Sequence, residues 1–235
     1  MINLLDPVRV KKERVALIGF LRGAKMDAAL SVLYFAEKYH NGTRKDGFTP
    51  EFAHQIQICL FLTTLNLDRS ILESCIIAAL AHDLFEDNQE LTCEYVANEC
   101  AFSIQTPKSQ GHKKDFVFSE SMAKGLEAAM VLSKIRNGVK MSQDTYLQNV
   151  ARNVIAALVK GVDRGNNFQT MSGVFSKEKQ IDYIDEGIEI LAYLKVARKR
   201  FPAMSNAFFN IEHMLKAQIE LISIMLDIHP TRKSL

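Results

Sequence analysis

The feature that most restricts the fold of this chain is a helical spacing of apolar residues along nearly all of its length. In AKMDAALSVLYFAEKYH, residues 24–40, apolar side chains recur every three or four positions and so share one face of a helix. Only 5 prolines and 11 glycines interrupt the 235 residues, and the alternation typical of strands is nearly absent. The sequence therefore predicts an all-α protein.

Capping signals divide this pattern into separate helices. Asn41-Gly42 is typical of a helix end, and Thr-Pro-Glu at 49–51 is typical of a helix start, which predicts a helix from about 50 to 65. A capping box at 70–73 predicts the next helix over roughly 71–85. Further helices are expected at about 92–101, 119–136, 144–163, 177–200 and 203–228, with loops at 102–118 and 165–176.

The composition limits the classes of function. Hydrophobic residues make up 48% and charged residues 24% of the chain, which is ordinary for a globular protein. A net charge of +2 gives no reason to expect binding to nucleic acid or to a membrane surface. No segment approaches the roughly 20 apolar residues that span a bilayer, and the opening MINLLDPVRVKKER lacks the apolar run of a signal peptide. We expect a single cytoplasmic domain over residues 1–235.

The four cysteines show no CxxC spacing that would indicate a zinc site or a redox motif. Cys59 and Cys75 lie inside apolar runs, where a cysteine is usually a buried free thiol. The sequence therefore predicts no disulfide framework, in keeping with a reducing compartment.

The segment AALAHDLFEDN, residues 78–88, combines an imidazole with three carboxylates at the end of an apolar run. His82, Asp83, Glu86 and Asp87 occupy positions i, i+1, i+4 and i+5, which form one strip on a helix. A divalent cation would offset the cost of burying them, and this mixture of nitrogen and oxygen suits manganese, iron or zinc better than calcium. For the dipeptide His-Asp alone, a solvated acidic helix end remains the better interpretation.

Two other segments strengthen the metal interpretation. His54 precedes His82 by one helix, a turn and a return helix, so an antiparallel hairpin would bring the two imidazoles side by side. Alone, His54 would more often be a partly buried, hydrogen-bonded histidine. Asp163 follows another apolar run and shares a helix face with Lys160 and Asn167, provided that the helix continues through residue 165.

Together these segments resemble the HD superfamily of metal-dependent phosphohydrolases, and more narrowly the alarmone hydrolase domain of the RelA/SpoT family. YHNGTRKDGFTPEFAH is similar to the H-x-G-x-x-R-K segment of that family, and AALAHDLFEDN is similar to A-x-L-H-D-x-x-E-D. ALVKGVDRGNNFQTM is similar to K-x-A-D-R-x-x-N-x-x-T, and DYIDEGIEILAYLK to the helix that follows. The similarity covers roughly residues 25–200 and implies an HD-type bundle of about eight to ten helices, with helix 203–228 packed on it.

The resemblance implies a role for each matching residue. Four match the ligands of a divalent metal, typically Mn²⁺ in this family: His54, His82, Asp83 and Asp163. Glu86 and Asp87 match the acidic pair that orients or deprotonates the attacking water. Six match contacts to the nucleotide and its phosphates: Arg44, Lys45, Lys160, Arg164, Asn167 and Thr170.

The implied reaction is hydrolysis of the 3′-pyrophosphate of (p)ppGpp to GDP or GTP and pyrophosphate, by a free-standing small alarmone hydrolase. A phosphatase acting on NADPH or another nucleotide is an alternative that the sequence leaves open. A non-catalytic nucleotide-binding regulator is a third, although such a protein has no use for an intact acidic pair.

The chain also departs from the family pattern at several places. Gln55 follows the first metal histidine, where proline is frequent, and DRGNN replaces the usual DRLHN. The segment 102–118 is an apparent insertion. An apolar stripe of methionine and phenylalanine on the last helix is expected to serve the core or the contact of a homo-oligomer.

Overall fold

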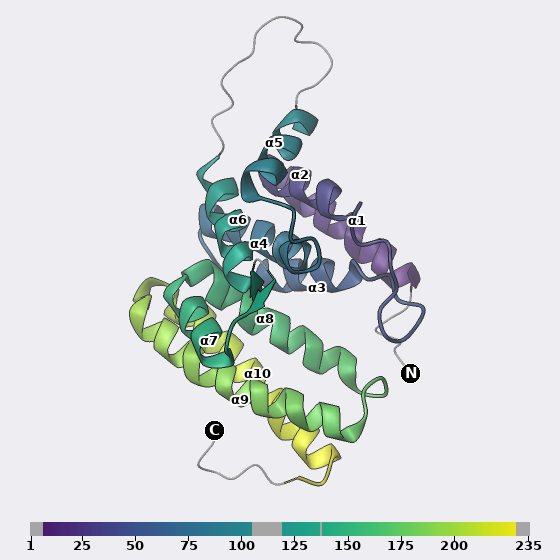
Figure 1. The fold of residues 1–235 in the computed structure, drawn as a ribbon, viewed down its shortest axis with the longest axis vertical. Helices are drawn as coiled ribbons and strands as arrows, with labels where there is room; N and C mark the ends of the chain where they lie inside the picture. The colour runs from purple at the N-terminus through teal and green to yellow at the C-terminus, as the bar shows by residue number, and fades with distance from the viewer. Residues whose placement is uncertain (1–6, 105–118, 137, 229–235) are drawn as a thin grey trace, which may run out of the picture.

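The computed structural model describes residues 7–104, 119–136 and 138–228 (Figure 1). Within these ranges the chain forms ten α-helices, which confirms the prediction of an all-α bundle. The helices are α1 (Pro7–Gly23), α2 (Asp27–Ala36), α3 (Ala53–Leu62), α4 (Arg69–Asp87), α5 (Cys93–Ile104), α6 (Glu120–Leu132), α7 (Gln143–Arg152), α8 (Val154–Met171), α9 (Lys177–Arg200) and α10 (Ser205–Met225). The other elements are an antiparallel hairpin of two short strands, β1 (Ile135–Arg136) and β2 (Val139–Lys140), and a short 3-10 helix, Pro202–Met204.

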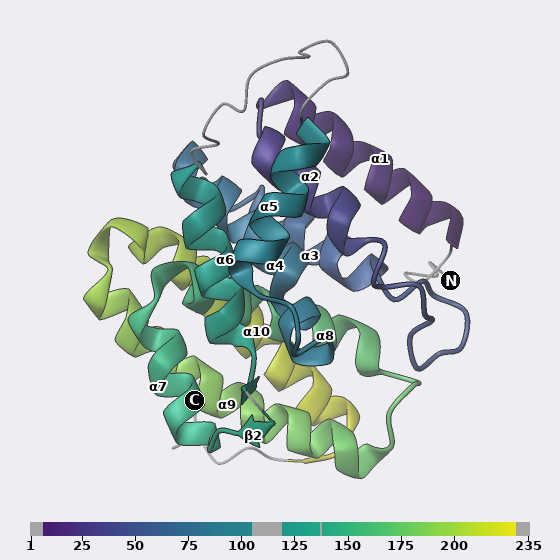
Figure 2. The same cartoon turned by 45° about the horizontal axis from the view of Figure 1, so that its top comes forward.

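Helix α4 occupies the centre of the bundle. It packs against α2, α3, α6 and α8, and the apolar stretch from Cys75 to Ala81 is inaccessible to solvent on every side. A helix that is apolar all round is stable only when neighbours cover all of its faces, which is the arrangement in Figures 1 and 2. Helix α8 lies between this group and α7, α9 and α10, and it contacts both.

The thiols behave as the sequence predicts. Cys59 and Cys75 are buried and free, and Cys100 is also buried. Burial raises the pKa of all three thiols above the ordinary value, which keeps them protonated. They therefore act as small apolar groups in the core.

The prediction of one helix over 144–163 followed by a loop over 165–176 is wrong. The chain breaks at Asn153 instead, whose side-chain oxygen accepts the N–H of Ala156 at 2.9 Å and caps α8. Helix α8 then continues through Gly165. A Cβ at Gly165 would lie 2.3 Å from Cε of Met214, so glycine allows α10 to approach α8 rather than ending the helix.

Other predicted boundaries shift for local reasons. Helix α3 begins at Ala53 and α4 at Arg69, so the caps expected at 49–51 and 70 do not start them. Helix α6 ends at Leu132, because the backbone becomes extended at the buried Ser133, whose hydroxyl donates to the carbonyl of Ile135 at 2.7 Å.

Three other helices also differ from the predictions. Helix α1 was not predicted, although its residues Leu17 and Leu21 are fully buried. Helix α2 is shorter than the predicted 24–40. Helix α5 extends into the start of the expected insertion 102–118, and the rest of that segment lies outside the described residues.

The apolar stripe on the last helix divides between core and surface. Phe208 is fully buried and Met214 is partly buried against the core, whereas Phe209 and Met225 are exposed. The homo-oligomer contact stays a prediction. No helix in the described ranges is both long and apolar enough to cross a membrane.

The packing of α6 on α4 gives a first testable prediction. A Cβ at Gly125 would lie 2.6 Å from Cβ of Ile77, so Gly125→Ala forces two packed helices apart. We expect the free energy of unfolding, measured by denaturant titration, to fall by about 1–3 kcal/mol.

Gly19→Ala in α1 is the matched control, because nothing lies within 4 Å of the added Cβ. This change should raise stability by about 0.4–1 kcal/mol through the unfolded chain. Equal effects of the two substitutions would contradict the close α4–α6 contact.

Candidate metal centre

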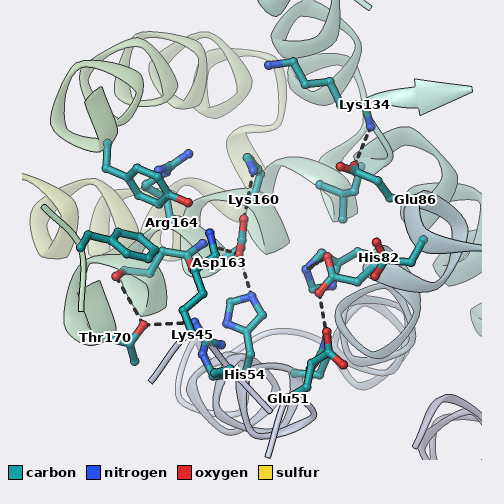
Figure 3. Close-up of a pocket in the computed structure, with 18 of the residues that line it drawn as sticks. Lys45, Glu51, His54, His82, Glu86, Lys134, Lys160, Asp163, Arg164 and Thr170 are labelled. Carbon is teal, nitrogen blue, oxygen red and sulfur yellow. Dashed lines mark hydrogen bonds and ion pairs between the residues drawn. The ribbon is translucent and has the colours of Figure 1, made fainter. Parts of the chain in front are cut away.

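A cavity of about 630 Å³ opens beside α3, α4 and α8. Its other walls come from α7, α9, the end of α6 with the segment that follows it, and the loops before α3 and α9. Figure 3 shows its lining side chains. The cavity brings together every residue that the sequence predicts for the site: Arg44, Lys45, His54, His82, Asp83, Glu86, Asp87, Lys160, Asp163, Arg164, Asn167 and Thr170.

Three buried side chains from three helices meet at the cavity. His54 lies in the first turn of α3, His82 near the end of α4, and Asp163 in the middle of α8. One ligand atom from each lies within 4.8 Å of the other two. The two imidazole rings have centroids 5.7 Å apart, so the helical hairpin places them side by side as expected.

Hydrogen bonds identify which ring nitrogen of each histidine carries the proton. Nδ1 of His54 lies 2.7 Å from Oδ1 of Asn166, whose amide nitrogen donates to Gln57, so that oxygen must accept. Nδ1 of His82 lies 2.8 Å from the carbonyl oxygen of Ala79, which can only accept. Both histidines therefore donate from Nδ1, and in the neutral ring Nε2 presents a lone pair.

These lone pairs face carboxylate oxygens. Nε2 of His54 is 3.0 Å from Oδ1 of Asp163, and Nε2 of His82 is 3.1 Å from Oδ1 of Asp83. A lone pair and an anionic oxygen repel at that distance unless a positive charge lies between them. Protons could supply that charge, and so could one divalent ion bound by two imidazoles and carboxylates, a donor set that suits Mn²⁺, Fe²⁺ or Zn²⁺.

Asp83 lies beside His82 on the more open side, and it is not one of the three residues whose ligand atoms all lie within 4.8 Å of one another. Its side chain is 38% exposed, unlike the buried Asp163. Its second oxygen accepts a hydrogen bond from Nε2 of Gln55 at 2.7 Å. The glutamine that departs from the family pattern therefore orients a predicted metal ligand, a contact that the sequence did not reveal.

Asp163 is held ionised by the groups around it (Figure 3). Burial opposes its charge, but the Lys160 ammonium at 3.0 Å from Oδ2 holds its pKa well below the ordinary value. Asn167 donates to Oδ1 at 2.9 Å. Burial likewise opposes the charge on Lys160, but Asp163 and Tyr146 outweigh it and raise its pKa.

The two acids predicted to act on water differ in their surroundings. Glu86 is half-buried, and its Oε2 accepts the backbone N–H of Lys134 at 3.1 Å. Asp87 is exposed, and its pKa is raised by partial burial and by the neighbouring carboxylate of Asp83. Lys134 was missed by sequence reasoning, because it leads into the hairpin where a helix was predicted.

Two arginines occupy fixed positions in the cavity wall. Arg164 is 3% exposed, pairs with Glu186, and lies with its guanidinium carbon 4.6 Å from the centroid of the Tyr183 ring. Its Nε and Nη1 make no hydrogen bond within the described part of the chain. Nη2 of Arg44 donates to Oγ1 of Thr170 at 3.3 Å, and burial lowers the pKa of Arg44.

Two lysines flank an aromatic ring in the same cavity region. The ammonium groups of Lys45 and Lys179 lie 5.0 and 4.5 Å from the centroid of Phe175. The pKa of Lys45 is lowered mainly by Lys179, since two cations are held near each other. Phe175 was not predicted as a site residue, because it lies in the segment expected to be a loop.

Comparison with known proteins adds no assignment. The search found no match to a protein-family model and none to a curated protein. Any function for this site must therefore be argued from its residues and their geometry.

The buried ion pair gives a second prediction. Lys160→Met leaves the Asp163 carboxylate without its cation, and the side chains of this pair are only 14% and 8% exposed. In metal-free protein at pH 7 we expect a loss of about 3–5 kcal/mol in the free energy of unfolding. Lys124→Met is the control, because it breaks a pair with Glu120 whose side chains are 50% and 80% exposed, and should cost less than about 1 kcal/mol.

The difference in the free energy of unfolding between wild type and Lys160→Met should depend on pH with a definite sign. The pKa of Asp163 is lower in the folded protein than in the unfolded chain, where it is about 4. Its contribution is therefore fully present above that value and is lost as the pH falls through the lowered folded pKa. In Lys160→Met the carboxylate is buried without its cation, which raises its folded pKa above the unfolded value. The gap between wild type and Lys160→Met should therefore be largest at high pH and narrow as the pH falls through that raised pKa; a gap that widens in acid would contradict this.

Proposed function

We propose that this chain is a metal-dependent phosphohydrolase of the HD superfamily that hydrolyses the 3′-pyrophosphate of (p)ppGpp, giving GDP or GTP and pyrophosphate. One observation carries the proposal: Nε2 of His54 faces the buried carboxylate of Asp163, and Nε2 of His82 faces the half-buried carboxylate of Asp83, at the same cavity. The ordered match of four sequence segments to the RelA/SpoT hydrolase pattern supports the narrower assignment.

The donor set supports Mn²⁺ as the resident ion, held by His54, His82, Asp83 and Asp163. A divalent ion lowers the pKa of a coordinated water toward neutrality and so supplies hydroxide. The hydrogen bonds from Nδ1 of both histidines fix the ring orientation and the tautomer, which is the usual role of groups behind a metal ligand.

The acidic pair would manage the proton of the attacking water. Glu86 uses Oε2 to accept the N–H of Lys134, which leaves Oε1 available for that proton. Asp87 lines the same cavity from the next position of α4. A positioned carboxylate of this kind contributes about 10²–10⁴-fold to a rate as a general base.

The rest of the cavity suits a nucleotide that carries several phosphates. Its volume of about 630 Å³ lies within the ordinary range for small-molecule sites. Arg44, Lys45 and Lys160 supply positive charge, and Phe175 and Tyr183 supply ring faces in the lining. A guanidinium such as that of Arg44 can pair with phosphate or lie against a purine.

The direct test is turnover of ppGpp by the purified chain with Mn²⁺, compared with NADPH and GTP in the same assay. We expect release of pyrophosphate and GDP from ppGpp, and little turnover of the other two. Faster release of phosphate from NADPH would show that the substrate is NADPH and would keep the proposal of metal-dependent hydrolysis. No turnover of any of the three, with metal bound, would contradict hydrolysis.

A third prediction concerns the ligand that is least buried. Asp83→Ala removes the carboxylate beside Nε2 of His82, so we expect both bound metal and ppGpp turnover to be lost. Elemental analysis after dialysis measures the metal. Asp182→Ala, an exposed change on α9, should retain both. Full metal occupancy in Asp83→Ala would remove Asp83 from the ligand set.

A fourth prediction separates binding from chemistry. Glu86→Gln keeps the shape of the side chain and an oxygen for the Lys134 N–H, but it cannot accept the proton. We expect metal content and KM to be retained while kcat falls by about 10²–10⁴-fold. Glu90→Gln, an exposed residue beyond the end of α4, is the control. An unchanged kcat for Glu86→Gln would transfer the role to Asp87.

A further inference from the structure

A second group of potential ligands lies beside the metal centre and shares no residue with it. His40 follows α2, Glu51 precedes α3, and Asp87 is the last residue of α4. A ring nitrogen of His40, a carboxylate oxygen of Glu51 and one of Asp87 all lie within 4.8 Å of one another. His40 is buried, Glu51 is half-buried and Asp87 is exposed, so the group faces solvent on one side.

The loop before α3 holds the first two of these residues in place. The N–H of Glu51 donates to the carbonyl of Gly42 at 3.0 Å, next to an antiparallel bridge between Thr43 and Pro50. A Cβ at Gly42 would lie only 3.0 Å from Oε2 of Glu51, so the carboxylate rests against the backbone there. The His40 ring stacks on Phe52, with centroids 5.8 Å apart and planes inclined by 18°.

The polar atoms of this group lack ordinary partners. The side chain of His40 is 3% exposed, and its buried Nε2 has no hydrogen-bond partner among the residues that the structure describes. Its Nδ1 is 3.9 Å from Oε2 of Glu51, which is too far for a hydrogen bond. No lysine or arginine in the described ranges forms an ion pair with Glu51 or Asp87. Buried polar groups of native proteins are nearly always satisfied, so this arrangement calls for a ligand.

We propose that His40, Glu51 and Asp87 form a second site for a divalent transition-metal ion. One imidazole nitrogen with two carboxylate oxygens suits Mn²⁺, Fe²⁺ or Zn²⁺ better than Ca²⁺ or Mg²⁺. The open side leaves room for water to complete the coordination. Because its ligands are fewer and less buried than those of the first centre, the second site binds its ion more weakly.

Occupation of this site has a consequence for the acidic pair. Asp87 would be engaged with the second ion, which leaves Glu86 as the member of the pair that remains free to accept a proton. The site itself does not depend on what substrate the cavity takes, so it can be tested by metal binding alone.

The test measures Mn²⁺ binding to the full chain after removal of bound metal, by equilibrium dialysis with detection of free Mn²⁺. We expect wild type to show a tight and a weaker class of site. Glu51→Gln should weaken the weaker class by at least about 10–100-fold, which is the loss for removing even an outer partner of a metal ligand, and leave the tight class unchanged. Glu94→Gln, an exposed residue on α5, removes the same charge elsewhere and should retain both classes.

Two further variants make the outcome decisive. Asp163→Asn should lose the tight class and retain the weaker one, whereas His40→Gln should reproduce the selective loss seen with Glu51→Gln; thermal unfolding confirms that each variant folds. A single class in wild type, or an unchanged weaker class in both Glu51→Gln and His40→Gln, overturns the proposal. Two classes of bound Mn²⁺ in a chain that does not hydrolyse ppGpp would retain this site and overturn the proposed function instead.

Discussion

The burial of the Asp163 carboxylate in the middle of α8 is the constraint on which the rest of the site depends. An ionised group is stable there because the Lys160 ammonium and the Asn167 amide, from neighbouring turns of the same helix, face it. The contact with His54 links α8 to α3, which in turn packs on α4 and so brings His82 to the same place. The contacts around the Asp163 carboxylate thus bring residues of α3, α4 and α8 together.

Much of this arrangement could be predicted from local sequence. The pairing of His54 with His82 requires only two helices and a turn, and the shared face of Lys160, Asp163 and Asn167 requires only the helical repeat. Both depend on contacts within or between adjacent helices. The helical class follows from the same periodicity, and the structure confirms it for the described residues.

The features that were missed depend on contacts between segments far apart in the chain. Gly165 is a typical helix breaker in isolation, and only the approach of Met214 from α10 explains why a glycine stands inside a continuous helix. Gln55 and Asn166 are ordinary polar residues until Asp83 and His54 are seen beside them. Asn153 is the exception, because asparagine is a common N-cap and its position was available as a signal.

The anchor of Glu86 has a consequence for how this site can vary. The carboxylate is held by the main-chain N–H of Lys134, a group that every amino acid except proline possesses. The side chain at residue 134 can therefore change in size or charge while the hydrogen bond to Glu86 is kept, provided that the backbone of the hairpin does not move. Most substitutions at residue 134 should therefore leave the position of Glu86 unchanged.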